Sequence, residues 1–150
     1  MDIIIRPADR SDIPEMCGLL SELFSLESDF SPDINKQAMG LALLVTDRSG
    51  LSAVFVAEKA GDIIGMCSVQ TLISTAQGGA VGLLEDLIVR KEERGDGAGA
   101  RLLSEVTAWC ENRNISRIQL LRDADNKRAR GFYTRNGWAS TRLVCMRKML

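Results

Sequence analysis

The chain has 150 residues, of which 45% are hydrophobic and 26% charged, and its formal net charge is −1. These values are typical of one ordinary globular domain with a sizeable core, and they exclude disordered, collagen-like and coiled-coil proteins. A pI near 5.5 lacks the basic footprint of a nucleic-acid-binding protein, and no segment approaches the ~20 apolar residues of a membrane span. We therefore expect a single cytoplasmic domain over residues 1–150 that binds neither nucleic acid nor membrane.

The N-terminal part predicts a strand followed by a helix. Residues 2–6 are mostly β-branched, which is typical of a strand. Asp12 has the position of an N-cap with Glu15 three residues on, and apolar residues recur at three- and four-residue spacing up to about Leu26. The pattern indicates one amphipathic helix.

A second helix and a β-hairpin follow. Ser31 suits the N-cap of this helix and Pro32 its first position, and the helix should end before residue 47. Residues 53–57 and 63–73 are rich in strand-forming side chains and are separated by a short turn containing glycine. They predict two antiparallel strands.

A long apolar strand opens the second half of the chain. Residues 80–89 have the pattern of a buried central strand, although Glu85 and Asp86 interrupt it. A helix with one apolar face follows from Ala98 and should end near residues 112–114.

The C-terminal part predicts further sheet and one more helix. We expect a strand over residues 115–121, a helix over residues 127–135 and the last strands within residues 144–150. No repeat, linker or low-complexity segment interrupts the chain, so the sequence indicates one α+β domain with a central mixed sheet.

The cysteines form neither a metal-binding nor a disulfide pattern. They are widely spaced, no C-x-x-C pair occurs, and the chain has no histidine to complete a zinc site. We expect no bound metal and interpret all four as reduced thiols in the core: Cys17, Cys67, Cys110 and Cys145.

Three glycines lie in the loop of residues 94–99, between the buried strand and the following helix. Backbone N–H groups at a helix N-terminus favour an anion, and glycines let the backbone approach a phosphate closely. The loop therefore predicts a pyrophosphate site, and the alternative is a merely flexible turn.

Two other phosphate-binding folds fit the sequence less well. Gly95-x-Gly97-x-x-Ala100 also matches the dinucleotide fingerprint, but the preceding strand has antiparallel neighbours and residues 112–122 contain no acidic side chain for a ribose. The chain also lacks the Gly-Lys-Ser/Thr of a P-loop.

Two motifs in register resemble those of the GCN5-related N-acetyltransferase (GNAT) family. Residues 94–99, after a strand ending in Val89, match its phosphate loop, and residues 126–138, with Asn126, Tyr133 and Gly137-Trp138, match its C-terminal motif. The element order is similar over the whole chain. Residues 84–87 (Leu-Glu-Asp-Leu) are most similar to the branches that acetylate diamines and small amines.

The chain departs from the pattern of this family at two positions. Lys91 stands where the family often has proline, and Asp96 places a negative charge in the phosphate loop. Both departures concern affinity for the phosphates rather than the type of reaction.

The resemblance implies three α/β/α layers, with a mixed, mostly antiparallel sheet of six to seven strands, about four helices and central parallel strands that splay apart. Acetyl-CoA, released as CoA, would lie between the splayed strands. Its pantetheine would pair with Leu87 and Val89, and its pyrophosphate would lie on residues 94–99. The cofactor-binding residues implied are Leu87, Ile88, Val89, Arg94, Gly95, Asp96, Gly97, Ala98, Gly99 and Asn126.

The resemblance also implies direct transfer of the acetyl group to an amine. Glu85 would be the general base, through a water molecule; a backbone N–H near Ile88 would polarise the acetyl carbonyl; and Tyr133 would be the general acid. Alternatives exist for each side chain. Asn126 suits a helix cap, and Tyr133 suits a core aromatic residue. Glu85 and Asp86 could form an ion pair with the basic C-terminal region, residues 113–150, which hold ten basic and two acidic side chains.

The choice between Glu85 and Asp86 depends on the geometry of their strand. Regular alternation puts residues 85, 87 and 89 on one face and residues 84, 86 and 88 on the other. A bulge, which similar enzymes have in this strand, would shift that parity and could turn Asp86 inward. The resemblance favours Glu85.

We expect the acceptor to be the primary amine of a small, cationic molecule. Glu27, Asp29 and Asp33 cluster between the first two helices, in the segment that borders the acceptor site in similar enzymes. The resemblance also allows a homodimer. The alternatives are an acyl-CoA-binding sensor without turnover and an N-acetyltransferase of proteins or peptides. A sensor has no need for Tyr133 and a carboxylate on the central strand.

Overall fold

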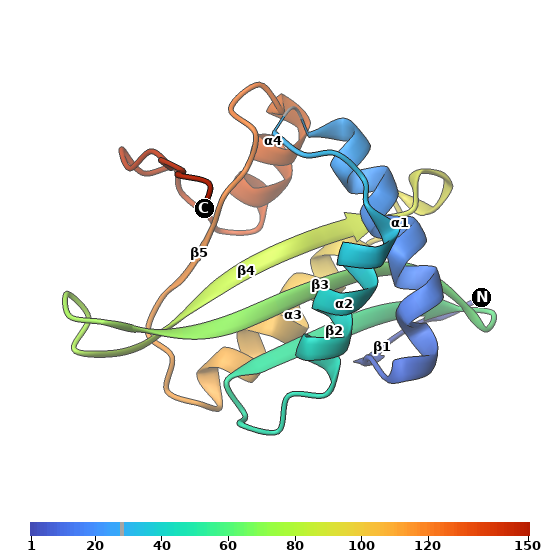
Figure 1. Cartoon of the computed structure of the whole chain (residues 1–150), viewed down its shortest axis with the longest axis horizontal. Coiled ribbons are helices and arrows are strands. Elements are labelled where there is room, and N and C mark those ends of the chain that lie inside the picture. The colour runs from blue at the N-terminus through green and yellow to red at the C-terminus, as the bar shows by residue number, and fades with distance from the viewer. Residues whose placement is uncertain (28) are drawn as a thin grey trace. The chain divides into compact units, whose positions relative to one another are not determined.

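Five strands and four helices form the fold of the described residues, 1–27 and 29–150, in this computed structural model. The strands are β1 (Ile3–Pro7), β2 (Ser52–Lys59), β3 (Asp62–Ser74), β4 (Gly79–Val89) and β5 (Ile118–Leu120). The helices are α1 (Ile13–Leu26), α2 (Ile34–Val45), α3 (Ala98–Glu111) and α4 (Lys127–Arg135), with 3-10 turns η1 (Arg10–Asp12) and η2 (Lys91–Glu93). Figure 1 shows their arrangement.

The strands form one sheet in the order β1-β2-β3-β4-β5, and all pairings except that of β4 with β5 are antiparallel. The mixed, mostly antiparallel sheet, the hairpin of β2 and β3 and the four helices confirm the prediction from sequence.

The chain divides into two compact units, Met1–Leu120 and Leu121–Leu150. The first unit holds the sheet with α1, α2 and α3, and the second holds α4. That the whole chain acts as a single domain stays a prediction. In the described part of the chain, no helix combines the length and the apolar character that crossing a membrane requires.

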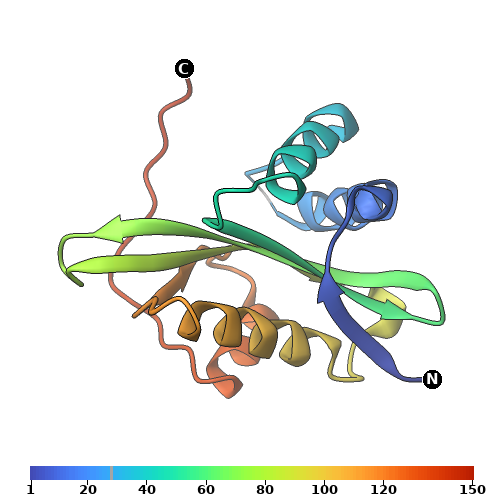
Figure 2. The same cartoon turned by 90° about the horizontal axis from the view of Figure 1, so that it is seen from below.

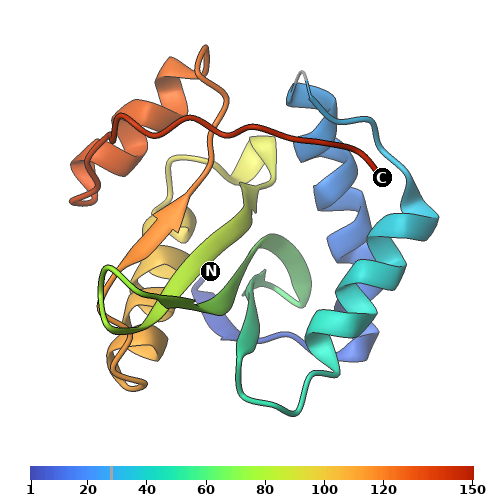
Figure 3. The same cartoon turned by 60° about the vertical axis from the view of Figure 1, so that its left-hand side comes forward.

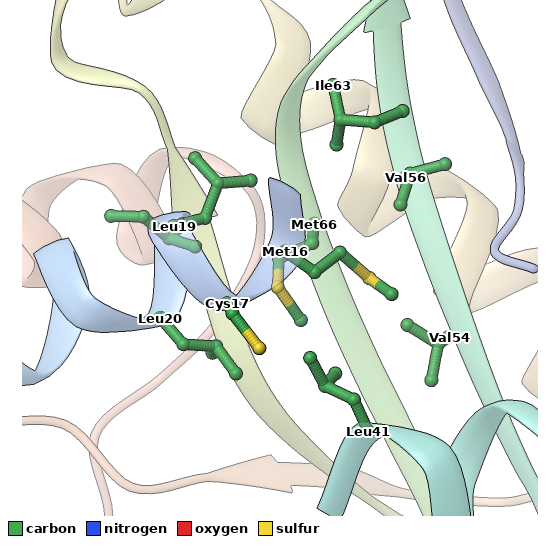
Figure 4. Packing of buried hydrophobic residues seen from close by; sticks show 10 residues of the cluster. Met16, Cys17, Leu19, Leu20, Leu41, Val54, Val56, Ile63 and Met66 are labelled. Carbon is green, nitrogen blue, oxygen red and sulfur yellow. The ribbon is translucent and has the colours of Figure 1, made fainter. Parts of the chain in front are cut away.

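Helices cover both faces of the sheet in Met1–Leu120, with α1 and α2 on one face and α3 on the other (Figures 2 and 3). The apolar spacing along α1 places Met16 and Leu20 in one buried cluster with Val56 and Met66 of the sheet (Figure 4). On the opposite face, Leu102 of α3 is completely buried. The α/β/α layers are therefore confirmed for this unit.

The expected strands in residues 144–150 are not present, so the predicted total of six to seven strands is wrong. The side chains of residues 139–150 are exposed. A strand needs a paired backbone, and within Leu121–Leu150 the only regular element is α4, which offers no strand edge. The strand predicted over residues 115–121 is likewise limited to β5.

The start of α1 differs from the sequence prediction. The capping box is formed by Asp9 and Asp12 around η1, and Asp12 makes no side-chain cap for α1. Its carboxylate is buried and pairs with the Arg6 guanidinium at 2.8 and 2.9 Å, which lowers the pKa of Asp12. Glu15 instead accepts a hydrogen bond from Ile63 N of β3 at 3.0 Å.

The start of α2 is also displaced from the predicted position. Asp33, rather than Ser31, is the N-cap, and its Oδ1 accepts from Lys36 N at 3.1 Å. In return Asp33 N donates to Gln37 Oε1 at 2.7 Å. This reciprocal pair satisfies two backbone donors, so Pro32 lies outside the helix rather than at its first position.

All four cysteines are free, but only three of them are core residues. Cys17, Cys67 and Cys110 are buried, and burial raises the pKa of Cys67 to about 12 and that of Cys110 to about 11. Cys145 is exposed because it lies in the C-terminal segment without regular structure, so its assignment to the core is wrong.

The close approach of β3 to β4 at Gly65 gives a stability prediction. A Cβ at Gly65 would lie 3.0 Å from Ile88 O and 3.4 Å from Leu102 Cδ1, so Gly65→Ala should destabilise the protein by about 1–3 kcal/mol. Gly18 in α1 has open space around it, and Gly18→Ala should stabilise by about 0.5–1 kcal/mol. Urea unfolding of both variants tests this, and equal effects would contradict it.

Candidate active site

Strand β4 contains a bulge where the two carboxylates interrupt it. Its register against β3 pairs Glu85 with Ser68 and Ile88 with Met66, so two residues of β4 lie opposite one residue of β3. Asp86, the first of the two, has a φ of 57°, in the left-handed region that Asp tolerates better than most residues. The bulge considered from the sequence is therefore present.

This bulge changes which side chains share a face of the sheet. Met66 and Ser68 are two residues apart and face the same side, so Ile88 and Glu85, their partners, do so as well. Ile88 belongs to the core cluster under α1 and α2, which identifies that side. Of the two arrangements considered from the sequence, the bulged one is therefore present, and regular alternation over residues 84–89 is not.

Beyond the bulge, one edge of β4 is free of any partner strand among the described residues of Met1–Leu120. The parallel strand β5 pairs only with Gly82–Leu84, so no strand described in Met1–Leu120 covers this side from Glu85 to Val89. Arg90 N donates to Ile64 O of β3 at 2.7 Å. Successive residues direct their N–H groups to opposite edges, so the N–H of Val89 points away from β3. The strands thus separate where the resemblance places pantetheine.

Three carboxylates gather on this unit near the bulge. Burial, then the negative charges of Glu85 and Glu27, raise the pKa of Asp86 to about 6. The Asp86 side chain is partly buried, whereas that of Glu85 is exposed to solvent. Glu27 directly follows the last residue of α1. The structure therefore brings together Glu27, one of the predicted acceptor residues, and both candidates for the base.

The other two predicted acceptor residues lie differently. Asp29 is exposed in the segment between α1 and α2. Asp33 is also exposed, but its carboxylate is used as the N-cap of α2. A role of either residue in acceptor binding stays a prediction.

The glycine loop has the geometry of an anion site. Gly95 and Gly97 have φ values of 97° and 85°, and nothing lies within 4 Å of a Cβ built on either residue. The first helical hydrogen bond runs from Arg101 N to Gly97 O at 3.0 Å. In the described structure the N–H groups of Ala98 and Gly99 make no hydrogen bond, so they can donate to a phosphate. The residues of this loop therefore fit a pyrophosphate.

Arg94, the first residue of this loop, connects three elements. Its Nε donates to Val89 O at 2.8 Å, and its Nη2 donates to Glu22 Oε1 of α1 at 2.9 Å. Its side chain therefore fixes the loop to the end of β4 and to α1. The sequence indicated a phosphate loop but gave no sign of this bracing role.

Asn126 and Tyr133 belong to the other unit, Leu121–Leu150. Asn126 Oδ1 accepts from Ala129 N at 3.0 Å, so the alternative of a helix cap is confirmed, whereas its binding of cofactor stays a prediction. Tyr133 is half-buried, and its ring lies 5.3 Å from that of Phe132 and 5.7 Å from that of Trp138. Its role as general acid also stays a prediction.

Lys59 is a residue near the loop that the sequence did not indicate. It is the last residue of β2, and its Nζ lies 2.6 Å from Glu93 Oε2 and 3.6 Å from Asp96 Oδ2. No local motif connects a lysine in a hairpin with a loop more than thirty residues later; only the register of the sheet does so.

Comparisons with known proteins identify the family of this chain. A model of the acetyltransferase (GNAT) family matches residues 16–138. An uncharacterized N-acetyltransferase of Archaeoglobus fulgidus is 30% identical over 132 residues, which cover 86% of this chain and 88% of that protein.

Two solved structures show that the fold is shared. Glucosamine-6-phosphate N-acetyltransferase from Arabidopsis thaliana has a TM-score of 0.78 and 19% identity, covering 99% of each chain. A predicted acetyltransferase with acetyl-CoA from Clostridium acetobutylicum has a TM-score of 0.79 and 18% identity, covering 98% of this chain and 96% of that one. Together with the family match, these likenesses mean that the chain belongs to the GNAT family and is an acetyl-CoA-dependent N-acetyltransferase.

Proposed function

We propose that the protein transfers the acetyl group of acetyl-CoA directly to the primary amine of a small, cationic molecule. The observation that carries this proposal is the bulge of β4, the strand that leads into the glycine loop. The partly buried Asp86 lies there beside Glu85, and it also interacts electrostatically with Glu27 at the end of α1. A raised pKa beside a free strand edge is typical of a catalytic site.

The donor is held by backbone groups in this proposal. Val89 N–H, on the free edge of β4, donates to a pantetheine carbonyl, and the N–H groups at the start of α3 receive the pyrophosphate. The ladder with β3 occupies the N–H of Ile88, which is paired with Met66. We therefore assign polarisation of the acetyl carbonyl to the bulged segment next to Ile88, where the ladder is interrupted.

Glu85 acts as the general base through water, as the resemblance implies. Its side chain is exposed, so water can reach the carboxylate. Asp86 is the second candidate, because a pKa of about 6 lies closer to the working range of a base near neutral pH. Tyr133 donates the proton to the departing thiolate.

Charge favours a cationic acceptor. The negative charges of Glu85 and Glu27 both act on Asp86, and in the described structure no ion pair neutralises Glu85 or Asp86. A positively charged amine would relieve this repulsion and would be attracted at long range. The relative from Arabidopsis thaliana is named for a phosphorylated amino sugar, so a shared fold does not fix the acceptor.

The acceptor proposal can be tested with a thiol-release assay across polyamines, aminoglycosides, amino sugars, amino acids and peptide N-termini. We expect the highest kcat/KM for small cationic amines and a decrease with ionic strength. Glu27→Gln should raise KM for them by about threefold to tenfold, whereas Glu105→Gln, exposed on α3 at the other face, should not. A preferred acceptor that is neutral or acidic apart from its amine would contradict the proposal.

Replacement of Gly97 tests the pyrophosphate site. CoA should raise the melting temperature of the wild type by binding the folded state, and Gly97→Val should abolish this shift because the side chain fills the open loop. Gly78→Val in the β3–β4 turn is a matched control, since the φ of 70° at Gly78 imposes a similar strain on valine and its surroundings are equally open. Loss of CoA binding in both variants would remove the specific role of the loop.

The two carboxylates are distinguished by their pH dependence. Glu85→Gln should lower kcat/KM by about 10²–10⁴-fold, most strongly at acidic pH where little amine is deprotonated, while Asp86→Asn should show no such pH dependence. The measurement is a profile of kcat/KM from pH 5 to 9 for both variants. If the variants exchanged behaviours, Asp86 would be the base.

The pH dependence of stability shows independently whether Asp86 is desolvated in the folded protein. The pKa of Asp86 is higher in the folded than in the unfolded protein, so its contribution to stability falls as pH rises from about 4 to about 6. The variant should therefore gain more stability relative to wild type at pH 8 than at pH 4. Equal differences at both pH values would mean that Asp86 is not desolvated.

A further inference from the structure

Two carboxylates border the phosphate loop, where they would repel a pyrophosphate. Glu93 ends η2, and Asp96 lies within the loop with 65% of its side chain exposed. Both are within a few residues of the N–H groups of Ala98 and Gly99. The electrostatic attraction of those donors and of the α3 dipole for phosphate would therefore be opposed by two nearby negative charges.

Lys59 joins both carboxylates from a different part of the sheet. Its Nζ lies 2.6 Å from Glu93 Oε2 and 3.6 Å from Asp96 Oδ2. Only 26% of the Lys59 side chain and 25% of the Glu93 side chain are exposed, so solvent screens this pair less than a fully exposed one. The hydrogen bond that Lys59 donates to the Glu93 carboxylate raises the pKa of Lys59, which keeps the ammonium charged. The β2–β3 turn and η2 lie at the same end of the sheet (Figure 2).

Arg94 does not contact these two carboxylates. Although it directly follows Glu93 and lies two residues before Asp96, its guanidinium is held by Val89 O and Glu22. Among the ion pairs of the described residues, Lys59 is the cation that contacts Asp96.

We propose that Lys59 is a positioning residue for CoA, which holds Glu93 and Asp96 together and offsets part of their negative charge so that the loop can accept the pyrophosphate. The proposal rests on the assignment of the pyrophosphate to residues 94–99. It explains how Asp96 is tolerated in a phosphate loop, since the cost of its charge is offset by a lysine from the neighbouring hairpin.

The first test is the affinity for CoA measured by calorimetry. Lys59→Met should raise the Kd about tenfold at low salt and less at high salt. Lys59→Arg should stay within about twofold of wild type, and Lys59→Met/Asp96→Asn should recover most of the loss. Arg48→Met, which removes one exposed positive charge from the α2–β2 loop, is the control and should bind CoA normally.

The second test separates electrostatics from a general structural role. With acetyl-CoA, Lys59→Met should raise KM and leave kcat nearly unchanged. With S-acetylpantetheine, which lacks the pyrophosphate, kcat/KM should equal that of the wild type. Equal losses with both donors would overturn the proposal, as would a double variant that binds CoA no better than Lys59→Met.

A third variant keeps the proposal testable if Lys59→Met does not fold. Asp96→Asn retains Lys59 and removes one repulsive charge from an exposed position, so it should tighten CoA binding about twofold to threefold. Weaker binding by Asp96→Asn would contradict the proposal. Normal CoA binding by Gly97→Val would instead contradict the pyrophosphate assignment itself, so the two failures are distinguishable.

Discussion

The register shift between β3 and β4 is the constraint on which the candidate site depends. A sheet without it would place Glu85 and Ile88 on opposite faces, and either the core under α1 and α2 or the exposed carboxylate would be lost. The extra residue lets β4 contribute to a tightly packed core while it presents two carboxylates. The left-handed backbone of Asp86 is the local cost of this arrangement.

Electrostatic roles are divided along β4 and the loop that follows it. Carboxylates gather near the bulge, whereas backbone donors lie unpaired at the start of α3. Arg94 connects these regions by contacting Val89 O and Glu22. One strand with its loop can therefore serve ligands of opposite charge, because the negative and positive potentials are separated along the chain and fixed by hydrogen bonds.

Patterns within a few residues predicted most of the fold and part of the site. The apolar spacing of α1 and α3, the β2–β3 hairpin and the glycine loop follow from neighbouring residues, and the structure agrees. The sequence allowed for a bulge in β4 but could not establish it, because the register of a strand depends on its packing against strands that are distant in sequence. Lys59 was not predictable for the same reason. The prediction of strands within residues 144–150 was wrong because β-propensity indicates an extended segment but not its pairing partner.

The free edge of β4 also bears on association between copies of the protein. Unpaired strand edges are templates for pairing with another chain, and therefore for aggregation. Here the edge carries Glu85, is twisted by the bulge at Asp86, and has the Val89 carbonyl already occupied by Arg94. An incoming strand would meet charge, irregular spacing and a missing acceptor. Within Met1–Leu120, the features that leave this edge without a partner strand thus also disfavour its pairing with the same edge of a second copy.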